Sequence, residues 1–249
     1  MARLLRRHWV FHIGHRAFQV RWPALSRAER CRYDQVVSLG HGCQPAYQIR
    51  RVLGVKSAHV FDWIVIPDPA LITLIGSDLD GFFSRERLGV GSSGAITDLP
   101  TDTRFVHEFP KDSEIDVQHA RHAGRYAMLV RRWRRLLRSR QRVLFVRQHG
   151  WDPDPRAAAA RLQALLSAKA PRLRFTLLYL TGDPADEVPW GQEGVINRHL
   201  PQPEPYDWRG DNAAWERLLR QALTEPCARS GAPDSPDAFG NRSNGVSSK

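Results

Sequence analysis

From Tyr33 to residue 225, short apolar runs typical of buried strands alternate with segments of helical periodicity, and this alternation limits the possible folds. Strands are predicted over 34–40, 105–109, 142–147, 175–180 and 195–200, and helices over 45–53, 69–83, 114–138, 155–170 and 212–223. Strands joined through helices run parallel. The sequence therefore predicts an α/β fold of three layers, in which a mostly parallel sheet carries helices on both faces. Ligands of such sheets bind beyond the carboxyl ends of the strands.

The two ends of the chain differ from this central part. Residues 1–32 contain eight arginines and one glutamate, so they carry +7 of the net charge of +11. Their mixture of arginine, histidine and aromatic residues has no helical or strand period, and we expect a poorly ordered basic extension. Residues 226–249 are rich in Ser, Gly, Pro and Asn, which predicts a disordered tail. A single domain of residues 33–225 lies between them.

Charge, cysteine content and hydropathy exclude several classes of function. Most of the positive charge lies in the N-terminal extension, so no specific nucleic-acid partner is predicted. The three cysteines, Cys31, Cys43 and Cys227, have neither the number of a disulfide framework nor the spacing of zinc ligands, which fits a reducing cytoplasm. No apolar run approaches the ~20 residues of a transmembrane helix. The turn at 40–42 lacks the third glycine of dinucleotide-binding loops, and no cofactor is predicted.

Residues 36–51 have the pattern of a buried strand, a glycine-containing turn and a helix with Cys43 in its first turn. The free N–H groups and the positive dipole end of a helix lower the pKa of a thiol there, which makes it a nucleophile. The alternative is a small apolar residue that fills the junction between strand and helix. The position of Cys43 at the predicted edge of the sheet favours the nucleophile.

A cysteine nucleophile needs an imidazole within hydrogen-bond reach. His107 lies in a predicted strand between two phenylalanines, although a core histidine bonded to a carbonyl explains it equally well. His149 follows another strand and is expected at the same edge as the cysteine. His41 adjoins the cysteine in sequence, in a turn that can point it away. His119 and His122 share a helix face, but no third ligand accompanies them, so no metal site is predicted.

The cysteine also needs donors for the oxyanion and a group that orients the imidazole. The backbone N–H groups of Cys43 and Gln44, or the side-chain amide of Gln44, are the candidate donors. Asp62 lies between two aromatic residues, where an unpaired carboxylate is costly, so a histidine or arginine partner is predicted. The alternative is an aspartate that caps a nearby turn. Glu108 is expected on the opposite face of the strand from His107.

Four blocks of the sequence resemble an uncharacterised bacterial family described as papain-like cysteine peptidases. The first is Ser38-Leu39-Gly40, with Cys43-Gln44-Pro45-Ala46-Tyr47-Gln48 and Arg50-Arg51 after it, and the others lie at 61–64, 105–109 and 143–147. The resemblance implies that Cys43 is the nucleophile, His107 the base and Asp62 the group that orients it. The sequence departs from the family at 41–42, where His-Gly replaces the more frequent Ser-Asn, and at Glu108, where Asp is frequent. Papain-like folds are α+β, whereas the periodicity here predicts α/β.

These features together predict a cytoplasmic cysteine-dependent hydrolase that cleaves an amide or ester bond. Its catalytic residues would be Cys43, His107 and Asp62, with Gln44, His41 and His149 at the oxyanion or the substrate. The substrate is expected to be a peptide, an amide or a glycan-linked molecule. The alternative is a non-catalytic α/β module that binds a sugar or a nucleotide-like ligand at the edge of the sheet. In that alternative, Cys43 is a packing residue.

Overall fold

The computed structural model describes residues 9–13, 16–20 and 32–225. Its strands are β1 (Trp9–Ile13), β2 (Arg16–Val20), β3 (Gln35–Ser38), β4 (Leu88–Val90), β5 (Ile96–Asp98), β6 (Thr103–Arg104), β7 (Arg142–Gln148), β8 (Arg174–Thr181) and β9 (Val195–His199). Its α-helices are α2 (Gln44–Leu53), α3 (Asp68–Gly76), α4 (Ile115–Leu137), α5 (Pro155–Lys169) and α6 (Asn212–Thr224). Short 3₁₀ helices lie at Arg85–Arg87 and Pro184–Glu187.

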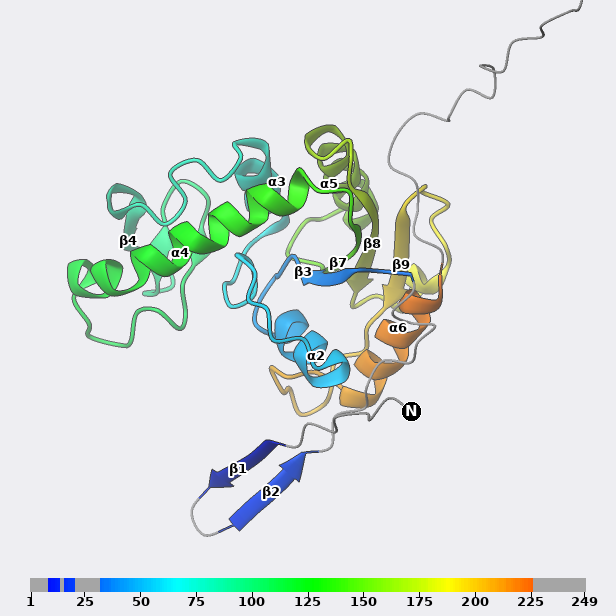
Figure 1. The fold of residues 1–249 in the computed structure, drawn as a ribbon, viewed down its shortest axis with the longest axis horizontal. Coiled ribbons are helices and arrows are strands. Elements are labelled where there is room, and N and C mark those ends of the chain that lie inside the picture. The colour runs from blue at the N-terminus through cyan, green and yellow to red at the C-terminus, as the bar shows by residue number, and fades with distance from the viewer. Residues whose placement is uncertain (1–8, 14–15, 21–31, 226–249) are drawn as a thin grey trace, which may run out of the picture.

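Four parallel strands form the main sheet in the order β3-β7-β8-β9 (Figure 1). Val37 pairs with Phe145, which in turn pairs with Leu177 on the next strand. Each crossover passes outside the sheet, so all four carboxyl ends lie along one edge. This arrangement confirms the predicted α/β class and the mostly parallel sheet.

Side chains that alternate along the strands divide the core in two. Val37, Phe145 and Leu177 belong to one cluster, together with the apolar residues of α3, α4 and α5. Leu144 and Leu178 belong to a second cluster, which includes the apolar residues of α2 and α6. Figure 1 shows α2 and α6 on one side of the sheet and α3, α4 and α5 on the other. Because helices cover both faces of the sheet, the inner parts of its strands are almost entirely apolar.

The segment between α3 and α4 differs from the prediction. The predicted strand over 105–109 is wrong: these residues form a turn, in which Phe105, Glu108 and Phe109 are buried while His107 is exposed. The apparent alternation in the sequence was therefore not that of a strand. Residues 88–104 of this segment form a small antiparallel sheet, β4-β5-β6, which was not predicted.

The helix predicted over 69–83 ends early, at Gly76. Asp78, Leu79 and Phe83 have positive φ angles of 59°, 58° and 60°, so the backbone continues as turns. Leu79 and Phe83 are nevertheless buried in the same cluster as α3. Their contacts with the core explain why the helical spacing of apolar residues continues where the helix does not.

Strands β1 and β2 pair as an antiparallel hairpin within the segment predicted to be a basic extension. The predicted disordered tail, 226–249, and two of the cysteines, Cys31 and Cys227, lie outside the described residues. Within the described part of the chain, no helix has the length and apolar character needed to cross a membrane.

Candidate active site

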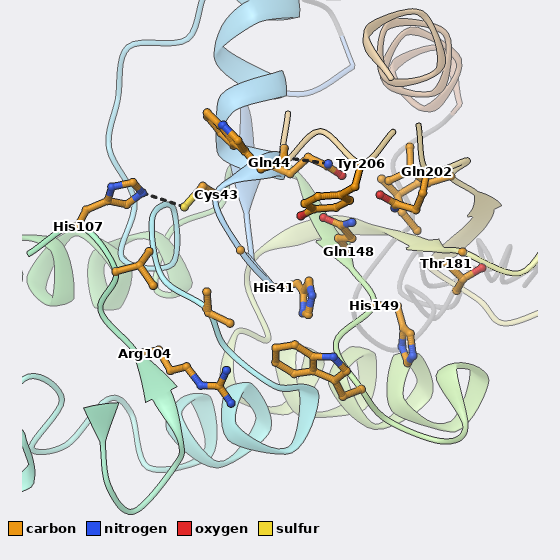
Figure 2. A pocket seen from close by; sticks show the side chains of 18 residues that line it. His41, Cys43, Gln44, Arg104, His107, Gln148, His149, Thr181, Gln202 and Tyr206 are labelled. Carbon is orange, nitrogen blue, oxygen red and sulfur yellow. Dashed lines mark hydrogen bonds between the residues drawn. The ribbon is translucent and has the colours of Figure 1, made fainter. Parts of the chain in front are cut away.

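A pocket of about 760 Å³ opens at the carboxyl ends of the four parallel strands. Each strand contributes to its wall through a residue at or just after its end: His41, Gln148, Thr181 and Leu200. Figure 2 shows Cys43 and His107 on one side of this pocket and His149 and Thr181 on the other. The expectation that Cys43 and His149 lie at the same edge of the sheet is met by this geometry.

The turn between β3 and α2 positions the thiol. Gly40 has a φ of +75°, and a Cβ there would lie 2.8 Å from the carbonyl oxygen of Phe61, so the turn requires glycine. Cys43 is the N-cap residue of α2, and its carbonyl accepts the first helical hydrogen bond, from the N–H of Tyr47 at 3.0 Å. The thiol is half-buried at the N-terminus of α2.

Cys43 and His107 are in direct contact. The Sγ atom lies 3.0 Å from Nε2 of His107, across 64 residues of sequence (Figure 2). The imidazole lies on the turn 105–109, and the ring of Trp63 packs edge-to-face against it with centroids 5.9 Å apart. A thiol and an imidazole at this distance can exchange a proton.

The pKa of the Cys43 thiol is raised, whereas the N-terminus of the helix was expected to lower it. Burial, and then the carboxylate of Glu108, raise the pKa of Cys43 to about 11. Glu108 is buried on the turn that carries His107, and its carboxylate faces Arg125 at 3.5 Å. The expected placement of Glu108 on an opposite strand face is wrong, because the segment is a turn. At neutral pH the thiol is therefore protonated beside the imidazole.

Asp62 does not contact His107. Its carboxylate accepts hydrogen bonds from the N–H of His59 at 2.9 Å and from Arg50 at 3.0 Å. Burial raises the pKa of Asp62, and the two hydrogen bonds oppose the rise. The Arg50 guanidinium lies 5.3 Å from the centroid of the Trp63 ring. Asp62 can therefore influence the imidazole only through Arg50 and Trp63, as a positioning residue.

The side chain of Gln44 holds a neighbouring loop. Its amide nitrogen donates to the carbonyl of Trp208 at 3.0 Å, and its oxygen accepts from the indole of Trp215 at 3.3 Å. A Cβ at Gly210 would lie 2.6 Å from the amide nitrogen, so the loop can approach only with glycine there. The donors closest to the thiol in sequence are then the backbone N–H groups of Cys43 and Gln44. The first turn of a helix leaves such groups without intrahelical acceptors.

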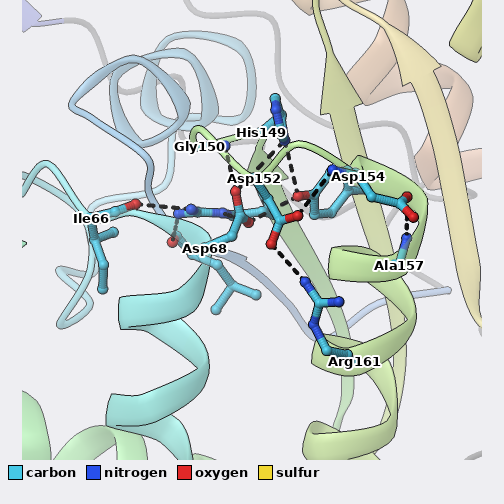
Figure 3. Close-up of polar contacts among 11 residues, drawn as sticks. Ile66, Asp68, His149, Gly150, Asp152, Asp154, Ala157 and Arg161 are labelled. Carbon is cyan, nitrogen blue, oxygen red and sulfur yellow. Dashed lines mark hydrogen bonds and ion pairs between the residues drawn. The ribbon is translucent and has the colours of Figure 1, made fainter. Parts of the chain in front are cut away.

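A buried ion pair lies below the pocket and was not predicted. Arg147 donates to Asp68 at 2.9 Å and to the carbonyls of Leu39 and Ile66 at 3.0 and 2.9 Å (Figure 3). Both charged side chains are almost completely inaccessible. The sequence carried one signal for this pair: Arg147 ends an otherwise apolar strand, where an unpaired charge would be costly.

His149 joins the same buried network. Its Nδ1 atom lies 3.3 Å from the hydroxyl of Tyr179 and 3.7 Å from Asp68. The Tyr179 hydroxyl donates to Asp68 at 2.9 Å, and burial and that carboxylate raise the pKa of the phenol. Asp68 also accepts from the N–H of Gly150 at 2.6 Å. The network therefore fixes the segment 149–151 at the edge of the pocket.

His41 lies in the pocket wall with an unusual backbone and a depressed pKa. Its φ angle is 107°, and its ring packs edge-to-face on Trp151 at 4.5 Å. Burial, and then the charge of Arg147, lower the pKa of His41 to about 4. The imidazole is therefore neutral at physiological pH and can serve as a hydrogen-bonding group.

The depressed pKa of His41 makes the fold sensitive to acid. Above pH 6.5 the residue is neutral in both states, and its contribution to stability is fully present. As the pH falls from 6.5 to 4, the unfolded chain binds a proton that the folded chain cannot, which lowers the free energy of unfolding by about 3 kcal/mol. In His41→Asn, which tolerates a positive φ, this part of the loss is expected to disappear in urea titrations over this pH range.

Another residue provides the control for this prediction. Burial lowers the pKa of His59 to about 4 as well, so a similar acid-dependent loss should remain in the variant. Equal losses of stability in wild type and His41→Asn between pH 6.5 and 4 would contradict the prediction.

The pocket residues that were absent from the candidates include Arg104, Trp151, Tyr206 and Trp208. All lie in or next to loops, where hydrophobic periodicity gives no signal. Trp151 and Tyr206 are 59% and 76% exposed, which is unusual for large aromatic side chains. Only their positions in the fold identify them as pocket residues, and the sequence does not give those positions.

His119, one of the paired histidines on α4, contacts the carbonyl of Phe83 at 3.2 Å through Nε2. Across residues 32–225, no group of three or more His, Cys, Asp or Glu side chains is arranged to hold a metal ion.

The sequence matches one family model. The model is described as “Putative papain-like cysteine peptidase”, and it matches residues 34–183, more than half of the chain. The matched region includes Cys43, Asp62 and His107. No curated protein matches the chain, and no solved structure does.

Proposed function

The chain belongs to the “Putative papain-like cysteine peptidase” family, and we propose that it is a cysteine-dependent hydrolase on a three-layer α/β scaffold. It would cleave an amide or ester bond, with Cys43 as nucleophile and His107 as base. The observation that carries the proposal is the 3.0 Å contact between the two side chains, because segments 64 residues apart bring them together at the mouth of a pocket.

In the proposed reaction, the thiol proton passes to Nε2 of His107 as Sγ attacks the carbonyl carbon of the substrate. The carbonyl oxygen becomes an oxyanion, for which the N–H groups of Cys43 and Gln44 are the nearest donors along the chain. When the intermediate collapses, the bond to the leaving amine or alcohol breaks, and the leaving group takes the proton from His107. Water, deprotonated by His107, then hydrolyses the thioester and regenerates the thiol.

The raised pKa of Cys43 makes this mechanism distinguishable from one that uses a preformed thiolate. At pH 7.5 we expect iodoacetamide, which reacts with thiolate, to alkylate Cys43 more slowly than it alkylates a cysteine peptide. We expect p-nitrophenyl acetate to acylate Cys43 faster than the peptide, because the imidazole removes the proton during attack. Mass spectrometry assigns both adducts, and Cys43→Ser is the control. Acylation no faster than that of the peptide would refute the proposed nucleophile.

The same raised pKa favours a second candidate, a non-catalytic binding module in which Cys43 is not a nucleophile. This candidate predicts that both reagents modify Cys43 more slowly than they modify the peptide. It also predicts that Cys43→Ala leaves ligand binding and stability nearly unchanged.

A further inference from the structure

We propose that the pocket beside Cys43 is a sugar-binding site in which Trp151 stacks on a pyranose ring. The inference extends the proposed function, on which it rests, by naming a substrate class: the bond to be cleaved belongs to a sugar-bearing molecule. Three observations support it, namely the conformation of Trp151, the hydrogen bonds that fix the residue before it and the scarcity of charged side chains in the pocket lining.

Trp151 has a strained backbone and a largely exposed side chain, although its ring contacts His41 and lies 5.6 Å from the Arg104 guanidinium. Its φ angle of 61° lies in the left-handed region, which is a true outlier for a bulky residue. The strained backbone exposes 59% of the residue to solvent. His41, whose ring packs on Trp151, is the neighbouring outlier with a φ of 107°. Strained residues that gather at one pocket indicate a role in ligand binding.

The buried network holds the tryptophan in place. Gly150 donates its N–H to Asp68 at 2.6 Å, and its carbonyl accepts from the N–H of Asp68 at 3.1 Å. A Cβ at Gly150 would lie 2.6 Å from the Arg147 guanidinium and 2.7 Å from the His41 ring. Gly150 is therefore held by hydrogen bonds through both its N–H and its carbonyl. The backbone that carries the Trp151 indole is rigid for this reason. Such preorganisation lowers the entropic cost of binding.

The chemistry of the lining favours a neutral ligand that is rich in hydroxyl groups. The strand ends present a carboxamide and an imidazole from Gln148 and His149. Among the described lining residues, Arg104 is the only arginine or lysine, and it is already paired with Asp102 at 3.0 Å. A phosphate-rich ligand such as a nucleotide would be left with little charge to neutralise it.

The aromatic rim fits a sugar better than an aromatic peptide side chain. The C–H bonds on one face of a pyranose carry partial positive charge, and they pack against the negative face of an indole. The hydroxyl groups at the ring edge need donors and acceptors, which Gln148 and His149 supply. A phenyl ring would leave those groups without partners, which is unfavourable for binding. Tyr206, also in the wall and 76% exposed, offers a second aromatic surface.

The test measures binding to the full chain by saturation-transfer NMR and chemical-shift titration. The probes are the methyl glycosides of glucose, galactose and N-acetylglucosamine, with AMP and N-acetylphenylalanine amide as competing classes. At least one glycoside is expected to bind saturably. Trp151→Gly removes both the ring and the strain, and it should weaken that binding about tenfold or more. Trp151→Phe should retain part of the affinity, while Val188→Ala, at an exposed site outside the pocket lining, should change nothing.

The inference is overturned if no glycoside binds, if Trp151→Gly binds the glycoside as tightly as wild type, or if only AMP or the phenylalanine amide binds. Its failure is separable from that of the proposed function, because acylation of Cys43 by p-nitrophenyl acetate is measured independently on the wild-type chain. Rapid acylation without glycoside binding refutes the sugar site alone. Glycoside binding without acylation refutes the hydrolase alone.

Discussion

His107→Ala is expected to slow the acylation of Cys43 by p-nitrophenyl acetate by about 10²–10⁴-fold at pH 7.5, the range attributed to general-base catalysis. The raised pKa of Cys43 leaves almost no thiolate at this pH, so the attack depends on transfer of the proton to an imidazole. In the structure, that imidazole is His107, with Nε2 at 3.0 Å from the thiol. The measurement is the single-turnover rate of p-nitrophenol release, with the acetyl adduct located by mass spectrometry.

His122→Ala is the matched control, since His122 lies on α4 and does not line the pocket. Its acylation rate should equal that of wild type. The imidazole of His107 is exposed, so its removal should leave the thermal unfolding midpoint unchanged. A His107→Ala protein that is acylated at the wild-type rate would show that another group removes the proton.

Asp68→Ala is expected to lower the free energy of unfolding by about 3–5 kcal/mol, because it leaves the buried Arg147 guanidinium without its counter-charge. The same change removes the acceptor for the Tyr179 hydroxyl and the Gly150 N–H. Urea unfolding followed by far-UV circular dichroism measures the loss. Adding Arg147→Met to Asp68→Ala should recover part of the stability, since the uncompensated charge is then absent.

The exposed ion pair between Arg85 and Asp116 provides the comparison. Asp116→Ala should leave the urea midpoint unchanged, because solvent screens charges at such a site. If Asp68→Ala is no more destabilising than Asp116→Ala, the buried pair does not stabilise the fold.

Much of the main sheet was predictable from the sequence. The inner parts of the strands, such as 143–146 and 177–180, are continuous apolar runs because both of their faces are covered, and the helices between them carry one apolar stripe. The segment 105–109 was mispredicted because turn residues can also alternate in polarity over so short a stretch. Residues 77–83 kept helical spacing through turns with positive φ angles, which apolar periodicity does not register.

The candidate site was predictable in part. The strand–turn–helix pattern indicated Cys43, and the resemblance to the family indicated His107, but no spacing rule joins residues so far apart in sequence. The expected role of Asp62 as the direct partner of the imidazole could not take account of Arg50, which binds that carboxylate in the fold. The pKa of the thiol is raised first by burial and then by the carboxylate of Glu108, whose position follows from the turn and not from the helix that holds the cysteine.

The proposed reactive pair and several residues of the pocket wall lie in different parts of the chain. Cys43 and His107 both precede β7, whereas Gln148, Thr181 and Tyr206 come from the end of β7 onwards. The match to the family model ends at residue 183, so Tyr206 and Trp208 lie outside the matched residues. Exchange of the segment after β9 between homologues should therefore redirect specificity while the reactive pair is inherited intact.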